Sequence, residues 1–125
     1  MLVNASAMLR AMAKVLTLPE RERGVCCPPR LALPRARVDE LASVLRALAD
    51  PTRLQIVLAL RAADEPVCIC DFTAAFDLSQ PTVSHHMAKL RAAGLVEVSR
   101  QGVWAYYRLR RDLPAHARRL VATLG

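Results

Sequence analysis

Residues 78–96 read LSQPTVSHHMAKLRAAGLV, and they contain the signals that start, shape and end one helix. Ser79 is a favourable N-cap because its hydroxyl can accept a hydrogen bond from a free backbone N–H, and Pro81 suits the first turn. Between these residues and Gly94, apolar side chains recur at three- and four-residue steps. Gly94 suits the position just after a helix, where the backbone turns left-handed. The segment therefore predicts a helix over 79–93.

Two longer helices are expected upstream. Residues 38–49 carry leucine and valine at three- and four-residue steps, and Asp39 is the expected cap of this helix. Asp50 precedes Pro51 and so resists the helical conformation, which ends the first helix. Proline is favourable in the first turn of the second helix, which is expected to end near Arg61.

The remaining elements complete a recognisable order. Residues 62–67 are expected to form a turn, and 71–76 a short helix that precedes the helix described first. Downstream, 95–98 and 103–109 alternate with a period of two around a glycine turn, which predicts a β-hairpin. A last helix is expected from about Asp112.

A short helix, a tight turn and a capped longer helix form a helix-turn-helix, and the hairpin makes it winged. The predicted fold class is therefore mainly α with a small β-hairpin, a winged helix-turn-helix.

The composition fits one domain with a basic surface. The chain has 125 residues, of which 54% are hydrophobic and only 4% aromatic. A core of this size, filled by leucine, valine and alanine, often gains stability from oligomerisation. The net charge of +7 suits nucleic acid, but equally an acidic protein or membrane surface. No apolar run reaches the roughly 20 residues that span a bilayer.

The N-terminal region differs from the rest. Residues 1–37 are expected to form an extension that carries Cys26 and Cys27 in a proline-rich arm, followed by a DNA-binding and dimerisation domain over 38–125. The start of the chain has basic residues inside its apolar stretch rather than ahead of it, so it fits a signal peptide poorly. The expected compartment is the cytoplasm, where thiols stay reduced.

Four segments together resemble the ArsR family of metal-responsive repressors, and the likeness covers roughly residues 38–113. The segments are ALADPTRLQIVLAL (47–60), VCICDF (67–72), LSQPTVSHHMAKLRAAGLV (78–96) and YYRL (106–109). The resemblance implies a homodimer that represses transcription by binding double-stranded operator DNA and that an ion releases. A two-fold dimer implies a pseudo-palindromic operator. The expected dimer elements are the helix over 38–49 and the terminal helix.

The helix over 79–93 is the expected reading helix, because the major groove admits one α-helix. Glutamine and serine can read base edges, whereas Lys89 and Arg91 are better suited to phosphates. Trp104, Tyr106 and Tyr107 are expected to build the wing rather than to stack on bases. The expected DNA contacts are Gln80, Thr82, Ser84, His85, Lys89 and Arg91 in the helix, and Arg100 and Gln101 in the wing.

Four cysteines, Cys26, Cys27, Cys68 and Cys70, are the candidate metal ligands, because soft ions prefer thiolates. As(III) takes three sulfurs, whereas Cd(II) favours four ligands, and four cysteines satisfy either number. On a regular helix, residues two apart point about 200° apart, so Cys68 and Cys70 can share an ion only where the backbone is bent.

The CxC motif resembles that of arsenic-, cadmium- and lead-sensing members of the family. It departs from their pattern, since Pro66-Val67 replace the usual Glu-Leu and a third cysteine is missing. A third thiolate must then come from elsewhere, and the resemblance implies that the arm of one subunit supplies it to the CxC of the other. As(III) or Sb(III) is the expected inducer, with Cd(II), Pb(II) or thiol oxidation as alternatives.

Two other readings are weaker. An enzyme is not expected, because the chain has no CxxC and no recognisable catalytic partner for its cysteines. Asp112 and His116 have the spacing of a zinc-binding pair in some family members, but a helix-end aspartate and a solvated histidine are favoured.

His85 and His86 are adjacent and are expected to face different ways.

Overall fold

The computed structural model describes residue 18 and residues 20–25 and 28–125. Residues 33–125 form one compact unit. Residues 18, 20–25 and 28–32 belong to a separate unit, and none of these described residues lies in a helix or strand. Cys26 and Cys27 lie outside the described residues.

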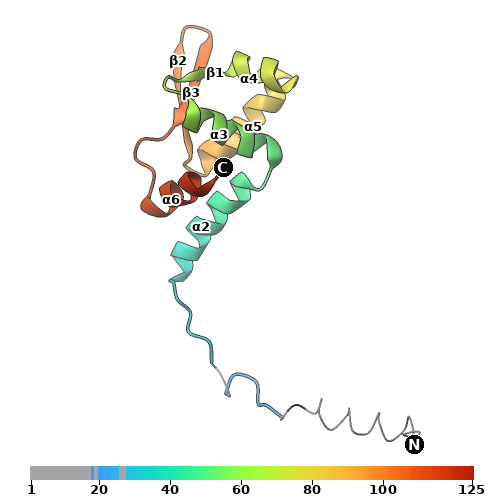
Figure 1. The fold of residues 1–125 in the computed structure, drawn as a ribbon, viewed down its shortest axis with the longest axis vertical. Coiled ribbons are helices and arrows are strands. Elements are labelled where there is room, and N and C mark those ends of the chain that lie inside the picture. Colours follow the sequence, from blue (N-terminus) through green and yellow to red (C-terminus); the bar gives the residue numbers. More distant parts are fainter. Residues whose placement is uncertain (1–17, 19, 26–27) are drawn as a thin grey trace, which may run out of the picture. The chain divides into compact units, whose positions relative to one another are not determined.

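The first two helices of the compact unit are α2 (Arg35–Leu48) and α3 (Pro51–Ala62) (Figure 1). Asp50 caps α3 and accepts a hydrogen bond from the backbone N–H of Arg53; the sequence had marked it only as the residue that ends the first helix. The prediction that Asp39 caps the first helix was wrong. The helix begins directly after Pro34, and Asp39 lies one turn inside it, 3.0 Å from the Arg35 Nε.

Helices α4 (Ile69–Phe76) and α5 (Gln80–Ala92) form the helix-turn-helix. Asp77 turns left-handed between them, with φ of 52°. Ser79 caps α5 by accepting from the backbone N–H of Thr82 at 3.4 Å, as predicted. Gly94 ends α5 with φ of 75°, and the flanking N–H groups donate back to the last turn. The local signals at Ser79 and Gly94 therefore account for where α5 begins and ends.

The sheet has three strands, β1 (Val67–Cys68), β2 (Val96–Gln101) and β3 (Trp104–Leu109), in the order β1-β3-β2. Strands β2 and β3 form the predicted antiparallel hairpin. Strand β1 was not predicted, because residues 62–67 were expected to be only a turn. It is two residues long and pairs antiparallel with β3, with Cys68 opposite Tyr106. Such a short strand has too few residues to show a period of two.

Helix α6 (Ala115–Thr123) closes the domain and contacts α2. It begins three residues later than expected, because Pro114 occupies its N-cap position and Leu113 is constrained to an extended conformation. The core is aliphatic, and its most buried large side chains are Ile56, Met87, Leu90, Leu95, Val57, Val83 and Val96. Among the residues that the structure describes, none of the helices has the length and apolar character needed to cross a membrane.

Candidate DNA interface and thiol pair

One side of α5 is open to solvent, and the side chain at its centre is that of His85. The inward side is fixed by three buried residues, Val83, Met87 and Leu90. At about 100° per residue, His85 points away from these three. Of the expected contacts, Gln80, Thr82, His85, Lys89 and Arg91 are exposed and Ser84 is partly buried.

The expected contacts on α5 fall into separate groups rather than one stripe. Gln80 and Thr82 lie in the first turn, where the helix offers short polar groups. Measured from Gln80 along the helix axis, Lys89 and Arg91 lie about 14 and 17 Å away, because the helix rises 1.5 Å per residue. By helical angle, Lys89 shares a flank with Thr82, and Arg91 shares the opposite flank with Gln80. The arrangement suits base contacts near the N-terminus and phosphate contacts at both flanks.

The wing tip is exposed and partly apolar. Arg100 and Gln101 are both exposed at the end of β2. Val103 is 89% exposed and Trp104 is 52% exposed. The aromatic residues were expected to serve the wing core and hairpin pairing. Tyr107 is buried, and Trp104 pairs within the hairpin although its side chain is half-exposed. Trp104 pairs with Gln101 beside the turn, beyond the reach of the core.

The two thiols of the CxC motif face each other. Cys68 ends β1 and caps α4 in an extended conformation, whereas Cys70 lies in the first turn of that helix. This change of backbone between the two residues is the bend that the sequence required, and it places the Cys70 Sγ 2.7 Å from the Cys68 Sγ. Cys68 is buried and Cys70 is exposed. The pair is therefore accessible from one side.

The surroundings of Cys70 favour its protonated thiol. The hydrogen bond to Cys68, together with desolvation and the nearby charge of Asp71, raises the pKa of the Cys70 thiol above its ordinary value. A thiol with a raised pKa is a poor nucleophile at neutral pH. The thiolate is also the form that binds a soft ion, so binding at Cys70 must release this proton.

Behind α5, a network not anticipated from sequence joins three helices. The Arg53 guanidinium donates to the carbonyls of Ala47 at 2.6 Å and Arg46 at 3.3 Å, at the end of α2. It also lies 3.5 Å from the Nδ1 atom of His86 on α5. His86 is partly buried and His85 is exposed, so the two rings face different ways, as predicted. The sequence had marked this corner only by the helix break at Asp50-Pro51.

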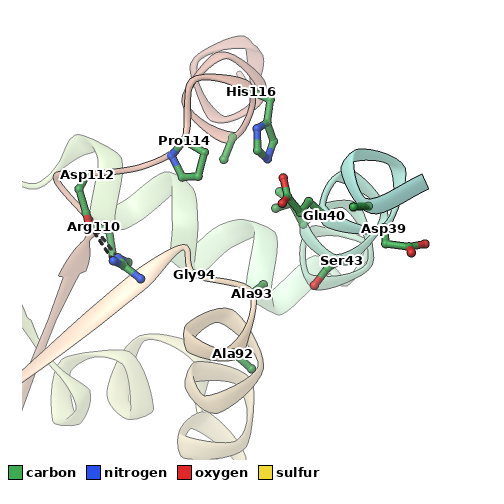
Figure 2. A pocket seen from close by; sticks show the side chains of 13 residues that line it. Asp39, Glu40, Ser43, Ala92, Ala93, Gly94, Arg110, Asp112, Pro114 and His116 are labelled. Atoms are coloured by element: carbon green, nitrogen blue, oxygen red, sulfur yellow. Dashed lines mark hydrogen bonds and ion pairs between the residues drawn. The ribbon is translucent and has the colours of Figure 1, made fainter. Parts of the chain in front are cut away.

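A cavity of about 660 Å³ lies between α2, the end of α5 and α6. Figure 2 shows His116 and Glu40 pointing toward each other across it, and Asp112 turned to Arg110. Arg110 binds the Asp112 carboxylate at 2.8 and 3.0 Å, and this hydrogen bonding lowers the pKa of Asp112.

Asp112 precedes α6, so it does not share a helical face with His116. The spacing of four residues therefore gives no support to a zinc-binding pair formed by these two side chains. Within the described part of the chain, no three histidine, cysteine or acidic side chains gather as metal ligands.

Comparison with known proteins agrees with this geometry. The family described as "Bacterial regulatory protein, arsR family" matches residues 50–98, from the cap of α3 into β2. A transcriptional repressor SmtB homolog from Synechocystis is 32% identical over 110 residues, which cover 79% of this chain and 82% of that protein. The chain belongs to the ArsR family. It is therefore a member of a family of DNA-binding regulators and not an enzyme.

Other relatives of this ArsR-family chain include the arsenical resistance operon repressor of Escherichia coli. The two are 45% identical over 78 residues, and the matched region spans 62% of this chain and 66% of the E. coli protein. Among solved structures, the homodimeric winged helix-turn-helix DNA-binding domain from Mycobacterium bovis superimposes with a TM-score of 0.59. It is 30% identical, and the match covers 74% of this chain and 84% of that one. The winged helix-turn-helix prediction is thus confirmed.

Proposed function

We propose that this ArsR-family chain is a homodimeric repressor that binds operator DNA and is released when As(III) or Sb(III) binds its thiols. The observation that carries the proposal is the 2.7 Å separation of the Cys68 and Cys70 sulfurs at the start of the helix-turn-helix. A soft ion that binds three sulfurs takes two of them from this pair and needs one more. Cys26 or Cys27 supplies it in our proposal, from the arm of the partner subunit.

DNA binding is proposed to use α5 in the major groove and the wing beside it. Base contacts come from Gln80, Thr82, Ser84 and His85, and phosphate contacts from Lys89 and Arg91. Arg100 and Gln101 contact the backbone or minor groove from the wing tip. The exposure of these side chains, of which only Ser84 is partly buried, and the net charge of +7 support this assignment.

Homodimerisation is proposed to use α2 and α6. Val38 and Leu45 are 44% and 52% exposed on α2, and they lie one above the other at a spacing of seven residues. They form a stripe separate from the side that packs on the core through Val44, Ala47 and Leu48. An exposed apolar stripe of this kind supports an interface with a second copy, and the homodimeric Mycobacterium bovis relative favours the same assembly.

Release follows from the position of the thiol pair. Cys68 belongs to β1, which pairs with the wing strand, and Cys70 belongs to α4, which packs against α5. An ion that bonds to both sulfurs and to the arm pulls on the wing and on the helix-turn-helix at once. Displacing either one from its groove weakens DNA binding, which is the switch that we propose. A reducing cytoplasm keeps the thiols available for the ion.

Cd(II) or Pb(II) would use the same thiols, and Cd(II), which favours four ligands, would take all four cysteines. Thiol oxidation is a second candidate, because the close sulfurs of Cys68 and Cys70 favour a redox reaction between them. Both alternatives keep the fold and the DNA interface and change only the signal.

The deciding experiment is a fluorescence-anisotropy titration of the reduced protein on DNA from its own promoter region. As(III), and in a separate series Cd(II), is then added to the complex. We expect As(III) to release the DNA, and Cys70→Ser to bind DNA normally but to resist release. Cys70 is the better test than Cys68, since it is exposed and its replacement leaves the core intact. Release by Cd(II) alone would change the inducer, and tight binding disturbed by neither ion would favour redox control.

A further inference from the structure

A second cavity, of about 380 Å³, lies between α2 and α5 and is positively charged. Its charged lining side chains are Arg46, Arg53 and Lys89, and no acidic residue lines it. Ala47 on α2 and Ala92 and Ala93 at the end of α5 also line it, and their small side chains leave room for an occupant. Ser43 adds a hydroxyl at the rim.

The three cations differ in what their charges already contact. Arg53 is largely buried, with 14% of its side chain exposed, and it is held by two carbonyls and by Asp50 3.8 Å away. It therefore acts as a brace that fixes the end of α2 against α3. Arg46 and Lys89 are exposed, and their side chains have no hydrogen-bond or ion-pair partner among the residues that the structure describes. The positive charges of Arg46 on α2 and Lys89 on α5, neither of them paired with a described acidic group, thus line the same cavity.

We propose that this cavity is a binding site for a phosphate of the DNA backbone, with Arg46 and Lys89 as its ligands and Ser43 as an additional donor. An arginine, an ammonium and a hydroxyl converging from two elements provide the charge-assisted hydrogen bonds that a phosphate accepts. The inference rests on the proposed DNA binding and extends the interface beyond α5 and the wing to α2.

The position of Lys89 favours DNA over a free phosphate. Lys89 lies on the reading helix, on the same flank as Thr82, and phosphates line both edges of the groove that such a helix enters. Because Arg46 belongs to α2, the same phosphate also contacts the helix that we propose for dimerisation. A change in the spacing of the two subunits would then directly alter the contact between Arg46 and the phosphate.

Salt dependence tests the site, because each neutralised phosphate adds about 0.9 to the slope of log affinity against log salt. Arg46→Gln is expected to weaken binding to operator and non-operator DNA by the same factor. It should also lower the slope by about 1, so that its deficit shrinks roughly fourfold between 50 and 200 mM salt. Lys89→Gln should behave alike. Arg111→Gln is the matched control, since Arg111 is exposed at the base of the hairpin and should leave the slope unchanged.

A neutral methylphosphonate, placed in turn at each phosphate of the operator, then identifies the partner. At one position the wild type should lose as much affinity as an Arg46→Gln/Lys89→Gln double variant loses on natural DNA, and the double variant should lose nothing further. An unchanged slope in Arg46→Gln, while the wild type still binds operator, overturns this site and leaves the proposed function standing. Wild-type protein that fails to bind operator would instead overturn the proposed function. If inorganic phosphate binds the DNA-free protein through Arg46 and the slope is unchanged, the ligand is a free phosphate and the DNA assignment is wrong.

Discussion

Arg53 stabilises the corner where α2, α3 and α5 meet. Its guanidinium bonds to the carbonyls of Ala47 and Arg46, which the end of α2 would otherwise leave without a partner. Arg53→Gln is expected to lower the free energy of unfolding by about 2 kcal/mol, because hydrogen bonds from a charged group are lost. Urea denaturation measures the change. Arg53→Lys should recover only part of it, since an ammonium lacks the planar fork that reaches two carbonyls.

The control is Arg119→Gln, because Arg119 is exposed on α6 and makes no side-chain hydrogen bond to any described residue. It should unfold like the wild type. Equal loss in Arg53→Gln and Arg119→Gln would show that net charge, not the local bonds, sets the stability.

Asp50 makes the same corner sensitive to acid. The backbone N–H of Arg53 first, and then the charges of Arg53 and His86, lower the pKa of the Asp50 carboxyl below its ordinary value. A lowered folded-state pKa stabilises the protein above the unfolded pKa of about 3.9, and this contribution is lost as the pH falls through the folded value. Asp50→Asn keeps a capping oxygen but removes the charge.

We therefore expect Asp50→Asn to be less stable than the wild type at pH 7, with the difference shrinking below about pH 4. Thermal denaturation at pH 7, 4 and 3 measures it. A difference that stays constant down to pH 3 would mean that the charge of Asp50 contributes nothing.

Whether the structural role of a residue could be predicted from the sequence depends on how far along the chain its partner lies. Ser79 and Gly94 act within three or four residues of themselves, so their caps could be predicted, and Asp50 could be recognised as the end of a helix because Pro51 follows it. Arg53 reaches His86, 33 residues away, and no local pattern encodes such a contact. The thiol pair is intermediate, because its spacing showed that a bend was needed but not that the sulfurs would meet.

The helices and the hairpin were predictable because their hydrophobic period runs over many residues. The strand β1 was not, since Val67 and Cys68 become a strand only by pairing with β3 from the far end of the domain. The start of α2 was misplaced for a related reason. Asp39 has the chemistry of a cap, but an ion pair with Arg35 inside the helix uses the same carboxylate.

The pairing of β1 with β3 predicts that an ion bound to the thiols of Cys68 and Cys70 changes the conformation of the wing. Directly opposed residues project to the same face, so Cys68 and Tyr106 share one face of the sheet, and Trp104 lies on that face two residues further along β3. Trp104 is the chain's single tryptophan and is half-exposed, so its emission reports on the wing. As(III) added to the DNA-free protein should change this emission, and Cys70→Ser should abolish the change.

If As(III) releases the DNA while the emission of Trp104 stays constant, the wing does not take part. The signal would then pass through α4 to α5 alone.

The molecule as a whole is expected to depend on its exposed α2 stripe. Leu45→Lys should leave the monomer folded, because Leu45 is 52% exposed and lies off the core. It should shift the protein to a monomer, since an ammonium in an apolar interface loses its hydration without a partner. Sedimentation measures the mass, and circular dichroism verifies the fold. Val103→Lys changes an even more exposed residue, at the wing tip, and should remain a dimer. A dimeric Leu45→Lys would place the interface elsewhere.

Two subunits also allow a test of where the third sulfur comes from. A Cys26→Ser/Cys27→Ser protomer keeps only the CxC thiols, and a Cys68→Ser/Cys70→Ser protomer keeps only the arm thiols. Each homodimer should bind operator and resist As(III), because neither has three thiols in one site. The heterodimer of the two, isolated with different tags, has one complete site only if the arm of one subunit reaches the CxC of the other. We expect As(III) to bind this heterodimer with a stoichiometry of one and to weaken its DNA binding.

The matched control is a heterodimer of the wild type with a protomer that lacks all four cysteines. Its wild-type subunit has every thiol, yet no site that crosses between subunits can form in it, so it should resist As(III). The two heterodimers have the same number of cysteines and differ only in how these are distributed. Because a site within one subunit would give the opposite result in both, the pair of measurements decides between the two arrangements. Release of the control heterodimer alone would mean that the arm folds back onto its own subunit, and the ion would then act on each reading head separately.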